Sequence, residues 1–129
     1  AWRIIRLPVT SPKPRRGAHL TTAFITHPDC LLHDMGGHHP EQPARLQAVE
    51  DQLIASGLAS CLQYVEAPLA RREHLERVHA PGYIDAIEAA APPRGIVHLD
   101  PDTAMNPHTL KAALRAAGAA VLATDMVIG

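Results

Sequence analysis

Short β-branched and apolar runs alternate with helical patterns along this chain, and this alternation is what most limits its fold. Strand-like runs occupy residues 20–26, 62–66 and 96–99. Between and after them, apolar residues recur at three- and four-residue steps, which is the period of an amphipathic helix. This order favours an α/β fold built on a parallel sheet. The length of 129 residues predicts a single domain.

Four helices are expected. The first runs from Pro43 to a stop at Gly57, followed by shorter helices at residues 72–79 and 83–91, separated by Pro81. The last begins with Asn106 as N-cap and Pro107 in its first turn. The apolar face of the first helix has four members: Leu46, Val49, Leu53 and Ile54. The last helix has small residues that allow another element to approach closely: Ala113, Ala117, Gly118 and Ala120.

Charge and cysteine content exclude several classes of protein. Twelve Lys and Arg face thirteen Asp and Glu, giving a net charge of −1, which argues against nucleic acid as the main partner. No apolar run approaches the roughly 20 residues of a membrane helix. Cys30 and Cys61 lie far apart, which favours two reduced thiols and a cytoplasmic location. Residues 1–17 are expected to form an extended arm before a domain at 18–129 that is incomplete at its C-terminal end.

Residues 33–46 form the most constrained stretch, because histidines, two glycines and two prolines occur together there. Gly36 and Gly37 permit positive φ, and Pro40 restricts His39 to extended backbone. We therefore expect a shaped loop, of the kind that carries function on a rigid scaffold. Metal binding by its histidines is less favoured than hydrogen bonding, since adjacent side chains such as His38 and His39 alternate in direction.

Asp100 and Asp102 precede the last helix pattern, where a carboxylate accepts backbone N–H groups or faces the positive helix end. The alternative is a carboxylate at a pocket rim that accepts hydrogen bonds from a substrate backbone. Both roles can hold for different residues. His79 is expected to cap or pack at a helix end, and no nucleophilic triad or phosphate-binding loop is apparent.

Three motifs in a fixed order resemble the N-terminal part of the histone deacetylase family. They are His39-Pro40-Glu41-x-Pro43-x-Arg45-Leu46, then Leu75-x-x-Val78-His79-x-x-x-Tyr83, then Asp100-x-Asp102-Thr103 before an Ala-rich helix through Ala116-Ala117-Gly118. Bacterial class II enzymes and their acetylpolyamine and acetoin-utilisation relatives fit best. The resemblance covers residues 21–129.

That resemblance implies an arginase-like, three-layer α/β fold with a central parallel sheet and a zinc-dependent amidohydrolase site. It implies as substrate an acetylated protein or a small acetylated amine. Asp102 resembles the rim aspartate that holds the substrate backbone, with His38 and His39 in the first loop at the pocket mouth. Arg45 resembles the arginine of an internal channel that holds or releases acetate, where a planar guanidinium suits a carboxylate.

The chain also departs from the family pattern. The paired-histidine motif, the zinc ligands and the catalytic tyrosine are absent, so we expect no catalytic or metal-binding residue in this segment. Zinc belongs to the full-length family, and the segment alone is predicted to be inactive. Two other hypotheses stay open: a self-standing binding module whose last helix pairs between copies as a homo-oligomer, and a metal-binding protein that uses the loop histidines.

Overall fold

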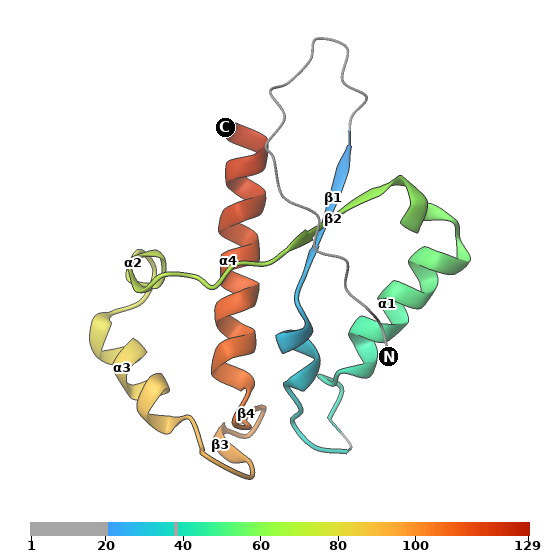
Figure 1. The fold of residues 1–129 in the computed structure, drawn as a ribbon. Helices are drawn as coiled ribbons and strands as arrows, with labels where there is room; N and C mark the ends of the chain where they lie inside the picture. Colours follow the sequence, from blue (N-terminus) through green and yellow to red (C-terminus); the bar gives the residue numbers. More distant parts are fainter. Residues whose placement is uncertain (1–20, 38) are drawn as a thin grey trace.

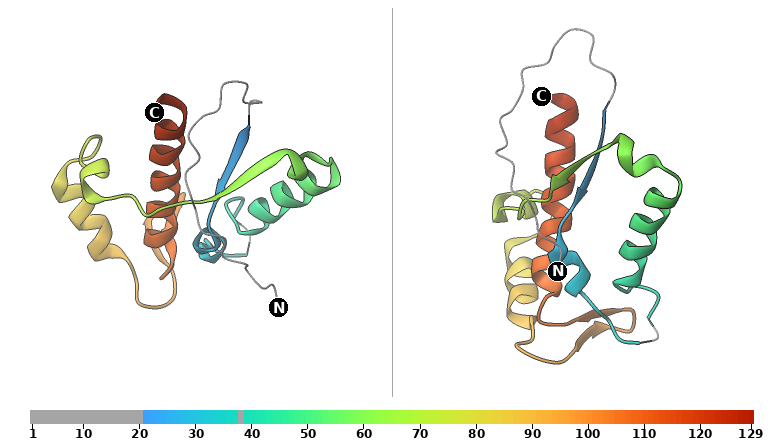
Figure 2. Two further views of the ribbon diagram at one scale, coloured as in Figure 1. Left: turned by 45° about the horizontal axis from the view of Figure 1, so that its top comes forward. Right: turned by 45° about the vertical axis from the view of Figure 1, so that its right-hand side comes forward.

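A long central helix organises the computed structural model, which describes residues 21–37 and 39–129. This helix, α4 (Thr109–Ile128), lies between α2 and α3 on one side and β1, β2 and α1 on the other (Figure 1). The views in Figure 2 show the same arrangement from two further sides. The predicted arm at residues 1–17 lies outside the described residues.

Two parallel strands confirm the predicted α/β class. β1 (Thr22–Thr26) pairs with β2 (Leu62–Glu66) in a register that aligns Thr22 with Leu62 and Thr26 with Glu66. Phe24 and Tyr64 face each other across the pair, with ring centroids 5.2 Å apart in an edge-to-face arrangement. Such aromatic and β-branched pairs stabilise neighbouring strands. Because each residue of β1 has a partner in β2 with no offset, both strands end at the same edge, beside α4.

The connection between these strands holds the 3₁₀ segment η1 (Pro28–Leu32), α1 (Ala44–Ala55) and the 3₁₀ segment η2 (Leu58–Cys61). α1 begins directly after Pro43, and Gly57 ends it in the left-handed conformation with φ of +76°, as predicted. No residue of α1 is buried, and Leu46, Val49 and Ile54 remain exposed. The predicted apolar face therefore forms, but the described residues do not cover it.

The predicted helix at residues 72–79 is too long. α2 spans only Arg72–Leu75, and α3 (Pro81–Ala90) starts at the proline that was expected to separate them. Ala80 is extended, with ψ of 141°, because a residue before proline is disfavoured in the helical region. Arg72 joins the two helices, since its guanidinium lies 2.7 Å from Glu76 and 2.7 Å from Asp85.

A β-hairpin precedes α4, and only its first strand was predicted. β3 (Val97–Asp100) pairs antiparallel with β4 (Thr103–Met105). The start of α4 also differs from prediction, because the helix begins at Thr109 and not at Pro107. The N-cap is His108 and not Asn106 as predicted. Asn106 Oδ1 accepts from the His108 backbone N–H at 2.9 Å and from the Thr109 hydroxyl at 3.0 Å, so it holds the residues just before the helix.

The connection after β2 packs against α4 at a glycine. Gly118 is buried, and a Cβ placed on it would lie 2.0 Å from the Pro68 carbonyl oxygen. The Ala70 backbone N–H donates to the Leu114 carbonyl at 2.9 Å in the same crossing. The close approach predicted for the small residues of the last helix is thus confirmed at Gly118.

The core is thin and built from small side chains. Its apolar members are Ala67, Ala70, Ile84, Ala104, Met105 and Ala112, all less than 9% exposed. In the described part of the chain, no helix has the length and apolar character needed to cross a membrane.

Candidate functional site

The loop between η1 and α1 has a defined shape, as its glycines and proline predicted. The Asp34 side chain accepts from the Gly36 backbone N–H at 2.8 Å, and Gly36 has a φ of +106°. The His39 backbone N–H donates to the Gly36 carbonyl at 3.1 Å, and His39 Nδ1 accepts from the Glu41 N–H at 3.0 Å. His39 therefore shapes the approach to α1, while His38 lies outside the described residues.

Arg45 lies in the first turn of α1, and its guanidinium pairs with the Glu41 carboxylate one turn earlier. Its side chain is 60% exposed. In the described part of the chain this guanidinium lies at the surface, whereas the resemblance implies an internal channel in the complete domain.

Glu41 also lines a cavity of about 290 Å³ between the loop and the start of α4, here called the His33–Glu41 pocket. Its polar lining comes from Cys30, His33, Glu41, Gln42 and Thr109. The rest of the lining is apolar and comes from Leu46, Ala112, Ala113 and Ala116. This pocket combines one imidazole, one thiol and one carboxylate, and the carboxylate is the one that Arg45 neutralises.

A hydrogen-bond network fixes the wall of this pocket. Thr109 Oγ1 lies 2.8 Å from His33 Nδ1 and accepts from the Asn106 backbone N–H at 2.8 Å. The Asn106 side-chain amide donates to the Leu32 carbonyl at 2.8 Å. Asn106 is 9% exposed, so these bonds join η1, the loop and α4 in a largely dry region.

The two aspartates of the β3–β4 turn have different roles. Asp100 Oδ1 accepts from the Asp102 backbone N–H at 2.8 Å. This bond, then a side-chain bond with Thr103, lowers the pKa of the Asp100 carboxyl below its usual value. Asp100 therefore shapes the turn. Asp102 is exposed, and its carboxylate makes no hydrogen bond or ion pair within residues 21–37 and 39–129.

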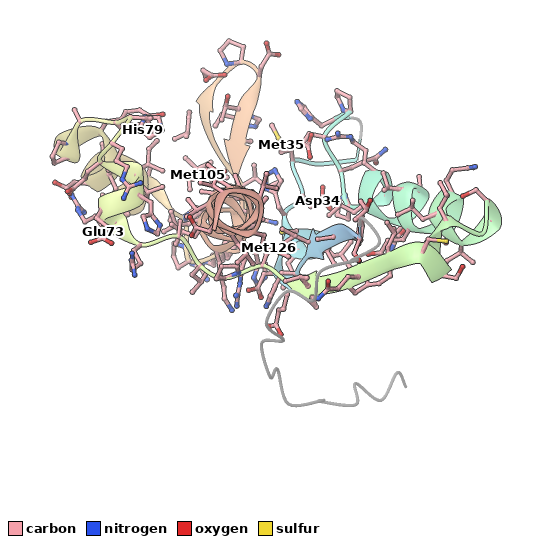
Figure 3. All side chains as sticks on the ribbon, turned by 90° about the horizontal axis from the view of Figure 1, so that it is seen from above. Asp34, Met35, Glu73, His79, Met105 and Met126 are labelled. Atoms are coloured by element: carbon pink, nitrogen blue, oxygen red, sulfur yellow. The ribbon has the colours of Figure 1, made fainter. Side chains whose placement is uncertain are left out.

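The loop and the hairpin lie at the same end of the molecule. In Figure 1 both lie at the foot of α4, and in Figure 3 the Met35 side chain lies between them. A Cβ on Gly36 would lie 4.0 Å from Ile96 Cδ1, directly before β3. The structure thus brings the loop close to the hairpin that carries Asp102. Asp102 itself does not line the His33–Glu41 pocket.

A second cavity lies on the other side of α4. Its volume is about 270 Å³, and it lies between α3, α4 and the hairpin. The lining is largely apolar and includes Ile84, Ile87, Leu99, Met105 and Leu110. His79 and Tyr83 stand at this cavity with ring centroids 5.3 Å apart, so His79 packs against an aromatic ring, in agreement with one of its predicted roles.

A charged cluster ties η1 to α4. Asp29 is 9% exposed and pairs with Arg115 at 2.8 Å and with Lys111 at 3.2 Å. Arg115 also donates to the Ala67 carbonyl at 2.7 Å, and His27 lies 3.0 Å from Asp29 and 3.1 Å from Glu66. Burial raises the pKa of the Asp29 carboxyl, but hydrogen bonds from Arg115 and Lys111 outweigh it, so the pKa lies below its ordinary value.

We expect this cluster to make the fold acid-sensitive. Because the pKa of Asp29 is lower in the folded state, Asp29 stabilises the fold above its unfolded pKa of about 4, and that contribution is lost as pH falls through the folded value. Melting temperatures measured from pH 6 to pH 2 should therefore fall less steeply for Asp29→Asn than for the unchanged chain. Asp51→Asn, an exposed carboxylate on α1, is the control. Equal slopes for Asp29→Asn and the unchanged chain would contradict the expectation.

Sequence inspection did not single out Asp29 or Arg115. A signal was available, since Lys111 and Arg115 stand four residues apart on an otherwise Ala-rich helix pattern and so share one face. For His33, hydrogen bonding was favoured over metal binding, but its partner Thr109 could not be predicted without the fold.

Comparisons with known proteins agree on one family. Residues 39–129 match the histone deacetylase domain. A histone deacetylase-like amidohydrolase of Pseudomonas aeruginosa strain PAO1 is 31% identical over 124 residues, covering 83% of this chain and 32% of the relative. The crystal structure of the HDA15 HD domain matches with a TM-score of 0.71 and 28% identity, over 81% of this chain and 31% of that one.

The chain therefore belongs to the histone deacetylase family, as its motifs predicted. The structural match also confirms the α/β fold class. The chain spans about a third of the length of the relatives described above.

Proposed function

We propose that this chain is the N-terminal part of a zinc-dependent deacetylase domain that hydrolyses the acetyl amide of acetyl-lysine or of a small acetylated amine. Within this domain it supplies the pocket rim and an arginine that holds the acetate product. The observation that carries the proposal is the placement of the histidine-containing loop beside the Asp102 hairpin at one end of α4, in a chain of this family.

The described residues do not fit a zinc site by themselves. Among residues 21–37 and 39–129, no group of three or more His, Cys, Asp or Glu side chains is placed to hold a metal ion. In our proposal the zinc ligands come from other parts of the protein, where the metal supplies Lewis-acid activation. The role of this chain is then to bind and orient the substrate and to hold the product.

Asp102 is suited to the pocket rim because the carboxylate of Asp100, and not its own, makes the hydrogen bond that shapes the turn. Asp100 accepts the Asp102 backbone N–H, which leaves the Asp102 carboxylate available for N–H groups of a substrate. A carboxylate that accepts N–H groups forms charge-assisted hydrogen bonds, which are about twice as strong as neutral ones. We propose that His38 and His39 border the same mouth from the loop.

Arg45 is suited to holding acetate because its present partner is also a carboxylate. Glu41 pairs with the Arg45 guanidinium and lines the His33–Glu41 pocket, so an acetate ion that displaced Glu41 would bring the same carboxylate group to a planar guanidinium. The exposure of Arg45 in this part of the chain requires that other parts of the domain cover it.

Exposed apolar side chains support the proposal that other parts of the domain cover this face of the chain. A parallel sheet normally has more than two strands and is buried on both faces, yet Tyr64 on β2 is 52% exposed. On α1, Ile54 is 66% exposed. Apolar surface of this kind marks a contact with another part of a protein.

We also propose a cytoplasmic location. The two cysteines are not bonded to each other, which supports a reducing compartment.

An activity assay tests the proposal. We expect no turnover of an acetyl-lysine peptide by the purified 129-residue chain with added zinc, and chelator-sensitive turnover by a longer protein that contains it. In that longer protein, Asp102→Ala should lower kcat/KM by about 10- to 100-fold, which corresponds to one charge-assisted hydrogen bond. Asp51→Ala is the matched control on α1.

Chelator-sensitive turnover by the 129-residue chain alone would refute the proposed division of roles. An unchanged kcat/KM for Asp102→Ala would refute the rim assignment. If the chain alone sedimented as a folded, defined oligomer and the longer protein showed no turnover, the alternative of a self-standing binding module would replace this proposal.

A further inference from the structure

Asn106 joins the base of the β3–β4 hairpin to the base of the loop at residues 33–41. It directly follows β4, and its side-chain amide donates at 2.8 Å to the carbonyl of Leu32, the last residue of η1. Because Asn106 is 9% exposed, water competes little for this bond, and a hydrogen bond away from water is electrostatically stronger. The end of the hairpin and the start of the loop are therefore fixed to each other at this point.

Thr109 extends this link to the first residue of the loop. Its hydroxyl oxygen lies 3.0 Å from Asn106 Oδ1 and 2.8 Å from His33 Nδ1. The Asn106 backbone N–H donates to the same oxygen at 2.8 Å. Asn106 is thus bonded through its side-chain amide to Leu32 and through the Thr109 hydroxyl to His33.

The hairpin and the loop meet again farther from this base. A Cβ on Gly36 would lie 4.0 Å from Ile96 Cδ1, and Ile96 stands directly before β3. This second contact is a van der Waals contact, which is weak for each pair of atoms and has no preferred angle. Hydrogen bonds, in contrast, weaken steeply away from their preferred angles. The orientation of the hairpin relative to the loop therefore depends on the bonds at Asn106.

The turn of this hairpin carries Asp102, the carboxylate that we place at the pocket rim. We propose that Asn106 is a positioning residue for this rim, which sets the distance between Asp102 and the loop and thereby determines how tightly a substrate with backbone N–H groups binds. Asn106 acts through Asp102 and does not itself touch the substrate. The inference rests on the proposed function, since the role of Asp102 is part of it.

This role predicts an effect that depends on the substrate. A peptide offers backbone N–H groups to Asp102, whereas a small acetylated amine offers no peptide backbone. Displacing Asp102 should therefore weaken binding of the first and leave binding of the second unchanged. A general loss of structure would lower the turnover of both, so the comparison separates positioning from stability.

The kinetic test uses the longer protein that contains this chain and two acetyl-lysine peptides of one sequence. The second peptide carries methyl groups on the two backbone nitrogens that flank the acetyl-lysine side chain, so it lacks their N–H groups. Asn106→Asp keeps an acceptor for the His108 N–H and removes the donor to Leu32. With the first peptide it should raise KM about three- to tenfold, as expected for one weakened hydrogen bond, with kcat within about twofold. With the methylated peptide, KM should not change.

A second readout is independent of activity. In the spectrum of the 129-residue chain, the nuclear Overhauser contact between the Ile96 methyl group and the Gly36 α-protons reports the distance between hairpin and loop. Asn106→Asp should weaken this contact at least twofold. His108→Ala is the matched control for both readouts, because it changes the adjacent exposed side chain and leaves the backbone N–H that Asn106 accepts.

The outcomes separate this inference from the proposed function. Equal losses with the two peptides, an unchanged KM with the first, or an unchanged Ile96–Gly36 contact would overturn the role of Asn106. If Asp102→Ala lowers kcat/KM in that case, the rim assignment stands without it. If Asp102→Ala has no effect, the rim assignment and this inference fail together. Should Asn106→Asp fail to fold, Thr109→Val is judged by the same readouts, with Thr109→Ser as the control that keeps the hydroxyl.

Discussion

Replacing Gly118 with alanine should destabilise the chain more than any other single methyl addition considered. The new Cβ would lie 2.0 Å from the Pro68 carbonyl oxygen, 2.8 Å from its carbonyl carbon and 2.9 Å from the Ala70 nitrogen. These are backbone atoms, so no side-chain rotation relieves the overlap. Overpacking typically costs 1–3 kcal/mol, and we expect about 3 kcal/mol or more here, measured as the free energy of unfolding in urea.

Gly82→Ala is the control for this prediction. Gly82 also lies in a helix, α3, but nothing lies within 4 Å of a Cβ placed there. Alanine should therefore be neutral or stabilise the chain by up to about 1 kcal/mol, because it is the better helix former. Similar effects of the two changes would show that the crossing at Pro68 is looser than the structure indicates.

Replacing Asn106 with alanine should have the second-largest effect. The change removes the donor to the Leu32 carbonyl and the acceptor for the His108 backbone N–H. A lost hydrogen bond costs about 1 kcal/mol net, and a buried group left without its partner costs about 1–3 kcal/mol. We therefore expect a loss of about 2–4 kcal/mol in the free energy of unfolding.

His108→Ala provides the matched comparison, because His108 stands next to α4, is exposed and makes no side-chain cap bond. Its effect should stay within about 0.5 kcal/mol. If Asn106→Ala cost no more than His108→Ala, the network that holds His33 would contribute little to stability.

Local signals in the sequence predicted the elements that depend on local chemistry. β-branched runs located β1 and β2, and Gly57 located the end of α1, because strand propensity and positive φ are properties of single residues. The end of α2 was misplaced, because the chain turns directly after Leu75, where the Val78 and His79 N–H groups donate to the Leu75 carbonyl, despite a helical spacing of apolar residues. β4 was missed because three residues are too few to show a period, and a hairpin partner decided their conformation.

In the candidate site too, some features depend on single residues and others depend on the packing of the whole fold. The shaped loop at residues 33–41 followed from Gly36 and Pro40, whose backbone preferences are intrinsic. The link from Asp29 to Arg115 and that from His33 to Thr109 join residues 86 and 76 positions apart, and only the packing of α4 brings them together. The roles of Asp102 and Arg45 rest on motifs, and they stay predictions.

The link between Asp29 and Arg115 also sets an order of events during synthesis. The strands β1 and β2 are complete once residue 66 has been made, but the ion pairs that join their carboxyl ends to a helix need residue 115. In a chain emerging N-terminus first, the two strands therefore lack these closing contacts until α4 has been translated as far as residue 115.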